Sequence, residues 1–100
     1  MQNVTLIGFG AIGRTLFARM AGHGSVRIAH VVVSAAHAAE VQAAVGPSAE
    51  VRCAVPMDTD LVIECAGHAA ITDHVLPALQ RGIECAVLSI GALSEPGLPE

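Results

Sequence analysis

A glycine run close to the N-terminus constrains this chain more than any other feature. Gly8, Gly10 and Gly13 form a G-x-G-x-x-G pattern that follows an apolar segment and opens an amphipathic one. A strand, a glycine turn and a helix in this order form the phosphate-binding start of a dinucleotide fold. The first glycine permits a tight turn, the second lets a pyrophosphate approach the backbone, and the third lets the helix pack closely on the sheet. The alternative is a glycine-rich turn of the same fold that binds no ligand.

Apolar segments alternate with helical patterns along the chain. Runs rich in β-branched residues predict strands at 3–9, 26–33, 50–55, 61–65 and 83–90. Apolar spacing predicts helices at 11–21, 36–45 and 69–80, and Pro77 is expected to kink the last of these or to force a local repair. Such alternation produces a parallel sheet with right-handed crossovers. We therefore predict a doubly wound, Rossmann-type α/β fold with about five strands, helices on both faces and the first strand in the centre.

The helical patterns also predict which side chains pack on the sheet. Gly82 follows the third helix and is expected to cap its C-terminus. The inward-facing residues are Ile12, Leu16, Phe17 and Met20 in the first helix, and Ile71, Val75, Leu76 and Leu79 in the third.

Composition limits the partners and the location of the chain. Hydrophobic residues make up 53% of the sequence, but no apolar run reaches the roughly 18 residues of a membrane span. Lysine is absent and the arginines are scattered, so no basic surface predicts nucleic-acid binding. The first apolar run reads directly as a strand, with no basic segment before it, which predicts a cytoplasmic protein without a signal peptide. The apolar excess predicts that another surface normally covers part of the domain.

The length allows one domain, and we interpret residues 1–100 as a dinucleotide-binding domain. A complete domain of this type has six strands, and a sixth element or a second domain is expected where the chain ends. We therefore expect either the N-terminal part of a longer two-domain enzyme or a truncated piece of one.

The residue at the end of the second strand distinguishes NAD from NADP in many dinucleotide folds. An acidic side chain about 20 positions past the glycine run binds the ribose 2′-hydroxyl of NAD, whereas an arginine accommodates the 2′-phosphate of NADP. The count from Gly13 leads to Ser34, the carboxylate of Glu40 lies too far along, and the loop contains no arginine. We predict that Ser34 contacts the ribose, against the alternative of a plain strand-end cap. Both NAD and NADP stay open as cofactors.

The loop after the fourth predicted strand is a further position for ligand contacts. Ala66, Gly67 and His68 follow this strand, and His68 either contacts the ligand or caps the helix that begins there. Glu64 ends the strand. We expect its carboxylate to cap the loop by hydrogen bonds, the alternative being a group with a raised pKa.

Neither the cysteines nor the other histidines have the spacing of a metal site or a catalytic pair. Cys65 and Cys85 lie in apolar runs, where we expect buried, reduced thiols. With Cys53 the chain has three cysteines, an odd number. The remaining histidines are expected to be structural or exposed, and they are His23, His30, His37 and His74.

Three further segments are more specific than the glycine run. They read E-C-A-G-H-A-A at 64–70, H-V-L-P-A-L at 74–79 followed by Gly82, and L-S-I-G-A-L at 88–93. Together with I-G-F-G-A-I-G at 7–13, they resemble the N-terminal part of the L-aspartate dehydrogenase family. The resemblance covers essentially the whole chain, although only part of that family's proteins.

The resemblance implies an NAD(P)-dependent oxidative deamination of L-aspartate. The product would be iminosuccinate, which proceeds to oxaloacetate and ammonia and also feeds NAD biosynthesis. The family's catalytic histidine and most of its substrate contacts lie in a C-terminal domain that no residue here matches, so we expect cofactor binding but no turnover by this chain alone. A homodimer is also implied. The resemblance assigns the pyrophosphate to Gly8, Gly10, Ala11, Ile12 and Gly13, the nicotinamide side to Ala66, Gly67 and His68, and closure of the cleft to Ser89, Gly91 and Ala92.

Three alternatives remain beside this interpretation. The first is the cofactor domain of another two-domain dehydrogenase, of the homoserine dehydrogenase type. The second is a non-catalytic nucleotide-binding or regulatory module. The third is a fragment without a function of its own, whose exposed apolar surface drives association.

Overall fold

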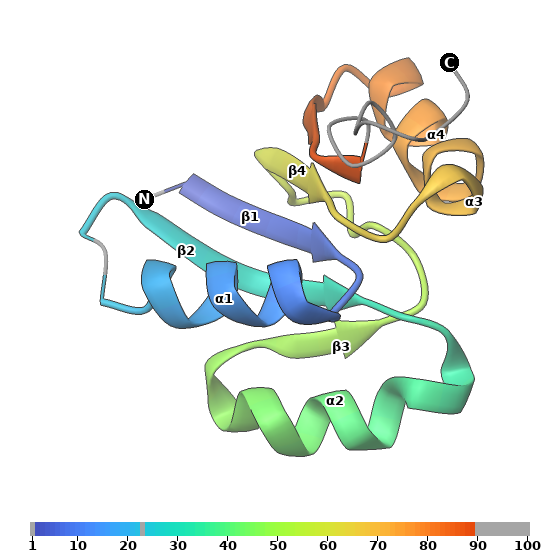
Figure 1. Ribbon diagram of the computed structural model, residues 1–100. Helices are drawn as coiled ribbons and strands as arrows, with labels where there is room; N and C mark the ends of the chain where they lie inside the picture. The colour runs from blue at the N-terminus through green and yellow to red at the C-terminus, as the bar shows by residue number, and fades with distance from the viewer. Residues whose placement is uncertain (1, 23, 90–100) are drawn as a thin grey trace, which may run out of the picture.

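A five-stranded parallel sheet with helices on both faces forms the centre of the molecule (Figure 1). The computed structural model describes residues 2–22 and 24–89. Neighbouring strands are parallel throughout, and their order is β3-β2-β1-β4-β5, so the predicted fold class and the central first strand are confirmed. The strands are β1 (Gln2–Ile7), β2 (Val26–Val32), β3 (Glu50–Arg52), β4 (Leu61–Glu64) and β5 (Glu84–Val87).

Each predicted strand exists, but each is shorter than the sequence indicates. The first was predicted to run to Phe9 and ends at Ile7, because Gly8 turns the chain with a φ of +93°. The third ends at Arg52, which pairs with Val32, the last residue of β2. The prediction for the fifth strand runs to Ile90, and that residue and the predicted tail at 91–100 lie outside the described residues.

The helical segments also follow the predicted positions. Helix α1 was expected to include Ala21 and ends one residue earlier, while the segment predicted at 36–45 divides into a 3₁₀ turn and a helix. Gly82 has a φ of +82° and its N–H donates to the carbonyl of Leu79, which confirms the predicted cap. The segments are α1 (Ala11–Met20), η1 (Ala35–His37), α2 (Ala38–Val45), η2 (Gly46–Ser48), α3 (His68–Ala70), η3 (Ile71–Val75) and α4 (Leu76–Gln80).

Pro77 explains why the last predicted helix is divided into three. A proline has no N–H for the carbonyl four residues back, and its ring crowds that carbonyl. The chain adapts through the π turn η3, in which the N–H of Leu76 donates to the carbonyl of Ile71, five residues back. The predicted local repair around Pro77 is therefore a π turn.

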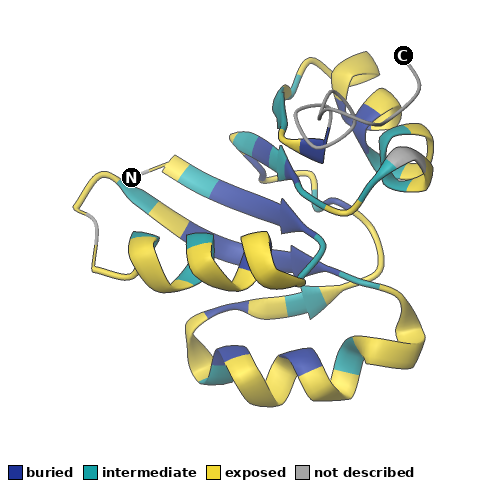
Figure 2. Cartoon of the chain, viewed as in Figure 1, coloured by how far each residue is buried: buried dark blue, intermediate teal, exposed yellow. Residues whose placement is uncertain are grey.

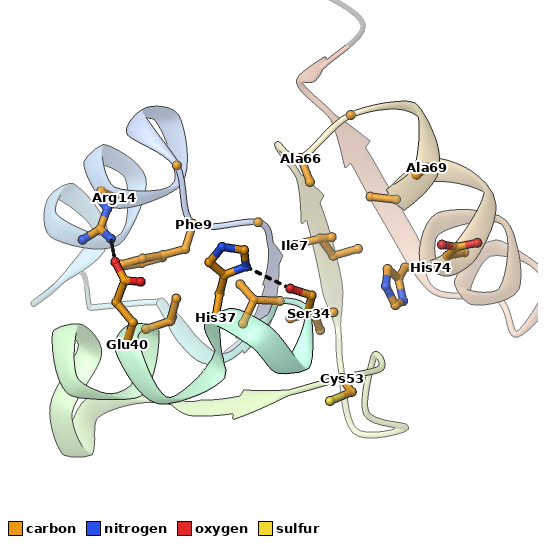
Figure 3. A pocket seen from close by; sticks show the side chains of 18 residues that line it. Ile7, Phe9, Arg14, Ser34, His37, Glu40, Cys53, Ala66, Ala69 and His74 are labelled. Carbon is orange, nitrogen blue, oxygen red and sulfur yellow. Dashed lines mark hydrogen bonds and ion pairs between the residues drawn. The ribbon is translucent and has the colours of Figure 1, made fainter.

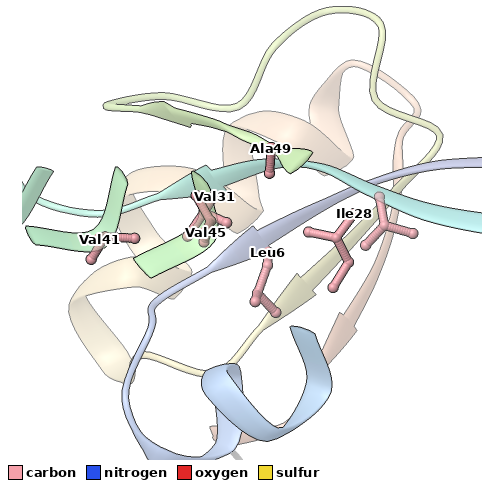
Figure 4. Packing of buried hydrophobic residues seen from close by; sticks show 7 residues of the cluster. Leu6, Ile28, Val31, Val41, Val45 and Ala49 are labelled. Atoms are coloured by element: carbon pink, nitrogen blue, oxygen red, sulfur yellow. The ribbon is translucent and has the colours of Figure 1, made fainter. Parts of the chain in front are cut away.

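Two apolar clusters lie on the two faces of the sheet. On one face, α1 and α2 pack against β1 and β2, and Leu6 and Val31 at the centre of this cluster are inaccessible to solvent (Figure 4). On the other face, Val75 and Ala78 from η3 and α4 cover Ile7, Val32 and Val62. Burial is concentrated along the central strands, whereas the outward sides of the helices are exposed (Figure 2). The sheet thereby holds the carboxyl ends of β1, β2 and β4 in fixed relative positions.

Some of the predicted inward-facing residues are wrong. Ile12 is 48% exposed, although Leu16, Phe17 and Met20 of the same helix pack on the core as predicted. Ile71 and Val75 also pack inward, but Leu76 and Leu79 are about half exposed, because the π turn rotates the following turn of helix relative to a regular 3.6-residue repeat.

Within 2–22 and 24–89, no helix is long and apolar enough to cross a bilayer.

Candidate functional site

The glycine turn between β1 and α1 is fixed by contacts to both neighbouring strands. The N–H of Gly8 donates to the carbonyl of Val32, and the N–H of Cys65 donates to the carbonyl of Ile7. A Cβ at Gly8 would lie 2.9 Å from the Cβ of Ala66, so the turns after β1 and β4 are in direct contact. At Gly8 glycine is therefore required twice, by the positive φ and by the lack of space.

Gly10 and Gly13 meet different surroundings. A Cβ at Gly13 would lie 2.7 Å from the carbonyl oxygen of Gly8, so the start of α1 packs tightly under the turn. A Cβ at Gly10 has nothing within 4 Å, and this residue is exposed at the N-terminus of α1. The N–H groups in the first turn of a helix have no partner within the helix, and in α1 no side chain caps them. The arrangement leaves an open backbone surface with donors beside Gly10.

Glu64 holds the loop after β4 and is the most buried ionisable group of the site. Its side chain is inaccessible to solvent. One carboxylate oxygen accepts hydrogen bonds from the N–H groups of Ala66 and Gly67, both at 2.6 Å, and the other accepts from the hydroxyl of Ser89 at 2.5 Å. The predicted capping role is confirmed, and the carboxylate also connects this loop to the segment that follows β5.

The thiol of Cys65 lies behind the glycine turn. It donates to the carbonyl of Ile7 at 3.1 Å and to that of Gly8 at 3.6 Å. Burial, and to a smaller extent the neighbouring Glu64 carboxylate, raises the pKa of this thiol to about 11. Both Cys65 and Cys85 are reduced, as predicted, but they are partly rather than fully buried. A neutral thiol therefore completes the packing between the turn and β4.

A pocket of about 850 Å³ opens at the carboxyl ends of β1, β2 and β4. This is the position where the chain order of the sheet reverses, at which ligands bind in open α/β sheets. Figure 3 shows the first turn of α1 and the start of α2 on one side of the pocket, with Ala69 and His74 on the other. Its described lining includes five of the residues predicted from the sequence: Gly8, Gly10, Ser34, Ala66 and Gly67.

Four other predicted residues that the structure describes do not line this pocket. Ala11, Ile12 and Gly13 form the first turn of α1, directly behind Gly10. Ser89 is buried, and its hydroxyl donates to the Glu64 carboxylate, which holds the loop after β4.

Three predicted positions fall in less fully described parts of the chain. His68 is the first residue of α3, and the surroundings of its side chain lie outside the described structure. Gly91 and Ala92 also lie outside the described residues.

The sequence interpretation missed a charged group on the β2 side of the pocket. The guanidinium of Arg14 lies 4.8 Å from the centre of the Phe9 ring and 4.0 Å from the carboxylate of Glu40 (Figure 3). Glu40 was judged to lie too far along the chain, but α2 returns beside α1 and brings it to the pocket. Arg14 directly follows Gly13, and this adjacency to the glycine run was the available signal. The loop after β2 itself contains no arginine, as the sequence indicates, and Arg14 reaches the pocket from α1 instead.

Two histidines expected to be structural or exposed also line the pocket. His37 is exposed at the end of η1, and its Nδ1 lies 2.9 Å from the hydroxyl of Ser34. His74 faces the pocket from the opposite wall (Figure 3), and its neighbour in the sequence, Asp73, also lines the pocket. Among residues 2–22 and 24–89, no three histidine, cysteine or acidic side chains gather in a group that would hold a metal ion.

Comparisons with known proteins agree with this geometry. A family model described as "Homoserine dehydrogenase, NAD binding domain" matches residues 8–100. The L-aspartate dehydrogenases of Ralstonia pickettii and Pseudomonas aeruginosa are 42% and 43% identical to the chain over 105 residues. The alignments cover 100% of this chain but only 39% of each relative, so the chain spans about two fifths of their length.

A comparison of structures supports the fold independently of the sequence. The yvaA oxidoreductase of Bacillus subtilis superimposes on 87% of this chain and 27% of its own, with a TM-score of 0.67 and 18% sequence identity. At this identity the likeness establishes the Rossmann-like architecture.

Proposed function

The chain belongs to the family of homoserine dehydrogenase-type NAD-binding domains, within which it is similar to L-aspartate dehydrogenases, and on this premise we propose where it binds NAD or NADP. The pyrophosphate lies over Gly10, in front of the first turn of α1. The observation that carries this proposal is the open space at Gly10, beside a helix start whose N–H groups have no intrahelical partner.

Each wall of the pocket then has a separate task. Unpaired N–H groups from Ala11, Ile12 and Gly13 stabilise the negative charge of the phosphates through the helix N-terminus. Ser34 at the end of β2 binds the adenosine ribose. Ala66 and Gly67, held by Glu64, form the wall on the nicotinamide side, where His68 also starts α3.

We propose that the whole enzyme catalyses the oxidative deamination of an amino acid. The names of the L-aspartate dehydrogenases at 42–43% identity support this proposal. The nicotinamide supplies hydride acceptance, and the protein supplies position and electrostatics. On this proposal, residues 1–100 are the N-terminal cofactor domain, and a further domain contributes the substrate contacts and the catalytic group. The family resemblance supports a homodimer, which sedimentation would test. We also propose a cytoplasmic location, which cell fractionation would test.

Titration calorimetry with NADH and NADPH tests cofactor binding directly. The chain contains no Trp or Tyr, so calorimetry replaces intrinsic fluorescence as the readout. Saturable one-to-one binding of at least one dinucleotide is expected. A folded chain that binds neither would contradict the proposed site.

The variant Gly10→Val localises the binding. Its side chain fits the free protein, because a Cβ at Gly10 meets nothing within 4 Å, but it occupies the place assigned to the pyrophosphate. Dinucleotide affinity should fall at least tenfold, a cost of about 1.4 kcal/mol, with an unchanged circular dichroism spectrum. Gly24→Val is the matched control, since Gly24 also has open space but lies between α1 and β2, away from the pocket. Equal affinities in the two variants would place the ligand elsewhere.

A further inference from the structure

The end of β2 lacks the acidic side chain that binds a ribose 2′-hydroxyl in many dinucleotide folds. In NAD-binding folds, an acidic side chain at this position accepts a hydrogen bond from the 2′-hydroxyl and repels a 2′-phosphate. Here the position holds Ser34, which is exposed, lines the pocket and carries no charge. Nothing at the strand end itself therefore opposes a phosphate.

Ser34 and His37 form a preorganised pair. The 3₁₀ turn η1 joins them, with the N–H of His37 donating to the carbonyl of Ser34 at 3.0 Å. The serine hydroxyl and the imidazole Nδ1 are 2.9 Å apart, so each restricts the orientation of the other. Both side chains are exposed to the pocket, and each is able to donate a hydrogen bond to an anion once the bond that they share is exchanged.

Arg14 places a positive charge on the same side of the pocket. Its guanidinium is held over the Phe9 ring at 4.8 Å, which limits its motion without neutralising it (Figure 3). Its other contact, Glu40, is 4.0 Å away, and the side chains are 50% and 71% exposed, so this ion pair is weak and readily exchanged for a stronger one. Arginine binds phosphate through a planar set of donors that a lysine does not provide.

From this cluster, and resting on the proposed function, we propose that the chain prefers NADP(H) over NAD(H). The 2′-phosphate accepts hydrogen bonds from Ser34 and His37 and is neutralised by Arg14. Glu40 partners Arg14 while the phosphate is absent. The distinguishing charge thus comes from α1 and not from the loop after β2, where it is usually sought.

Affinities for NADPH and NADH, measured by calorimetry on the purified chain, test this preference. A charge-assisted phosphate contact corresponds to roughly a tenfold to hundredfold change in affinity, so NADPH should bind at least tenfold more tightly than NADH. Adenosine 2′,5′-bisphosphate and adenosine 5′-monophosphate should repeat the same ratio, because they differ only in the 2′-phosphate. NADH binding as tightly as NADPH, or more tightly, would overturn the proposal while leaving the dinucleotide site intact.

Three variants assign the effect to the cluster. Arg14→Gln and His37→Ala should each weaken NADPH binding about tenfold and change NADH binding less than twofold, and Ser34→Asp should reverse the preference. Arg27→Gln is the control, since it removes the same charge at the opposite end of β2. Equal losses for NADPH and NADH in Arg14→Gln would show a pyrophosphate role and refute the 2′-phosphate assignment. A folded wild-type chain that binds neither dinucleotide would refute the proposed function itself.

Discussion

Substitution of Gly8 by alanine tests the contact between the turns after β1 and β4. The new Cβ would meet two separate obstacles. The φ of +93° costs an L-residue about 1–3 kcal/mol. The 2.9 Å approach to the Cβ of Ala66 adds a packing cost of about 1–3 kcal/mol, because the nearby Ala66 backbone at 3.1–3.2 Å prevents a simple side-chain adjustment. Gly8→Ala should therefore lower the free energy of unfolding by about 2–6 kcal/mol.

Gly82→Ala separates the two costs. Gly82 has a similar φ of +82°, but a Cβ there has nothing within 4 Å, so only the backbone strain applies. The entropy that alanine removes from the unfolded chain is common to both variants and cancels in the comparison. The difference between them, about 1–3 kcal/mol, corresponds to roughly 5–20 °C in midpoint for a domain of this size.

Thermal melts followed by far-ultraviolet circular dichroism give the required midpoints, and a second substitution checks the cause. Ala66→Gly in the Gly8→Ala background removes the nearest clashing atom, so the pair should show a favourable coupling of about 0.5–2 kcal/mol. The reasoning fails if Gly8→Ala is no more destabilising than Gly82→Ala. It also fails if the effects at positions 8 and 66 are additive.

Other consequences follow from the buried groups. Glu64→Ala should destabilise the chain by about 2–4 kcal/mol in urea unfolding, because two N–H groups and the Ser89 hydroxyl lose their acceptor, whereas Glu64→Gln should recover about half of this. Equal losses in both variants would contradict the hydrogen-bond explanation. Since burial raises the pKa of Cys65 from 9.0 to about 11, the unfolded chain loses this proton first, and the free energy of unfolding should fall as pH rises from 9 to 11. Cys65→Ala should show a smaller fall over that range, and an identical pH profile would refute the assignment. Leu6→Ala, at a fully buried position, should cost about 3–5 kcal/mol by the same urea assay, and a loss below 1 kcal/mol would mean that the cluster around it rearranges to fill the cavity.

The local features of this chain were predictable from the sequence because each has a local cause. A strand of β-branched residues, a glycine turn and an amphipathic helix are determined by residues a few positions apart, which is why β1, Gly8 and α1 were predicted correctly. The capping role of Glu64 was predictable for the same reason, since the N–H groups that it binds lie two and three residues further on. Only its contact with Ser89, 25 residues away, could not be predicted without the tertiary structure.

Errors arose where periodicity was extended past a local irregularity. A regular helix through Pro77 would have buried Leu76 and Leu79, but the π turn changes the phase of the helix and exposes them. Ile12 continues the apolar stripe of α1, yet it is exposed in the first turn, where the neighbouring Gly13 makes the close contact with the glycine turn.

The sequence by itself determined that this is a dinucleotide fold, with its glycine turn at 8–13 and a first strand at the centre of the sheet. Only the tertiary structure decided which charges face the pocket. Arg14 and Glu40 are 26 positions apart, and Arg14 lies on a different helix from His37. Arg14 and Glu40 meet because consecutive β-α-β crossovers of one hand place α1 and α2 side by side on the same face of the sheet. The chemistry of each side chain follows from the sequence, but which side chains meet at the pocket depends on the packing of elements that are distant along the chain.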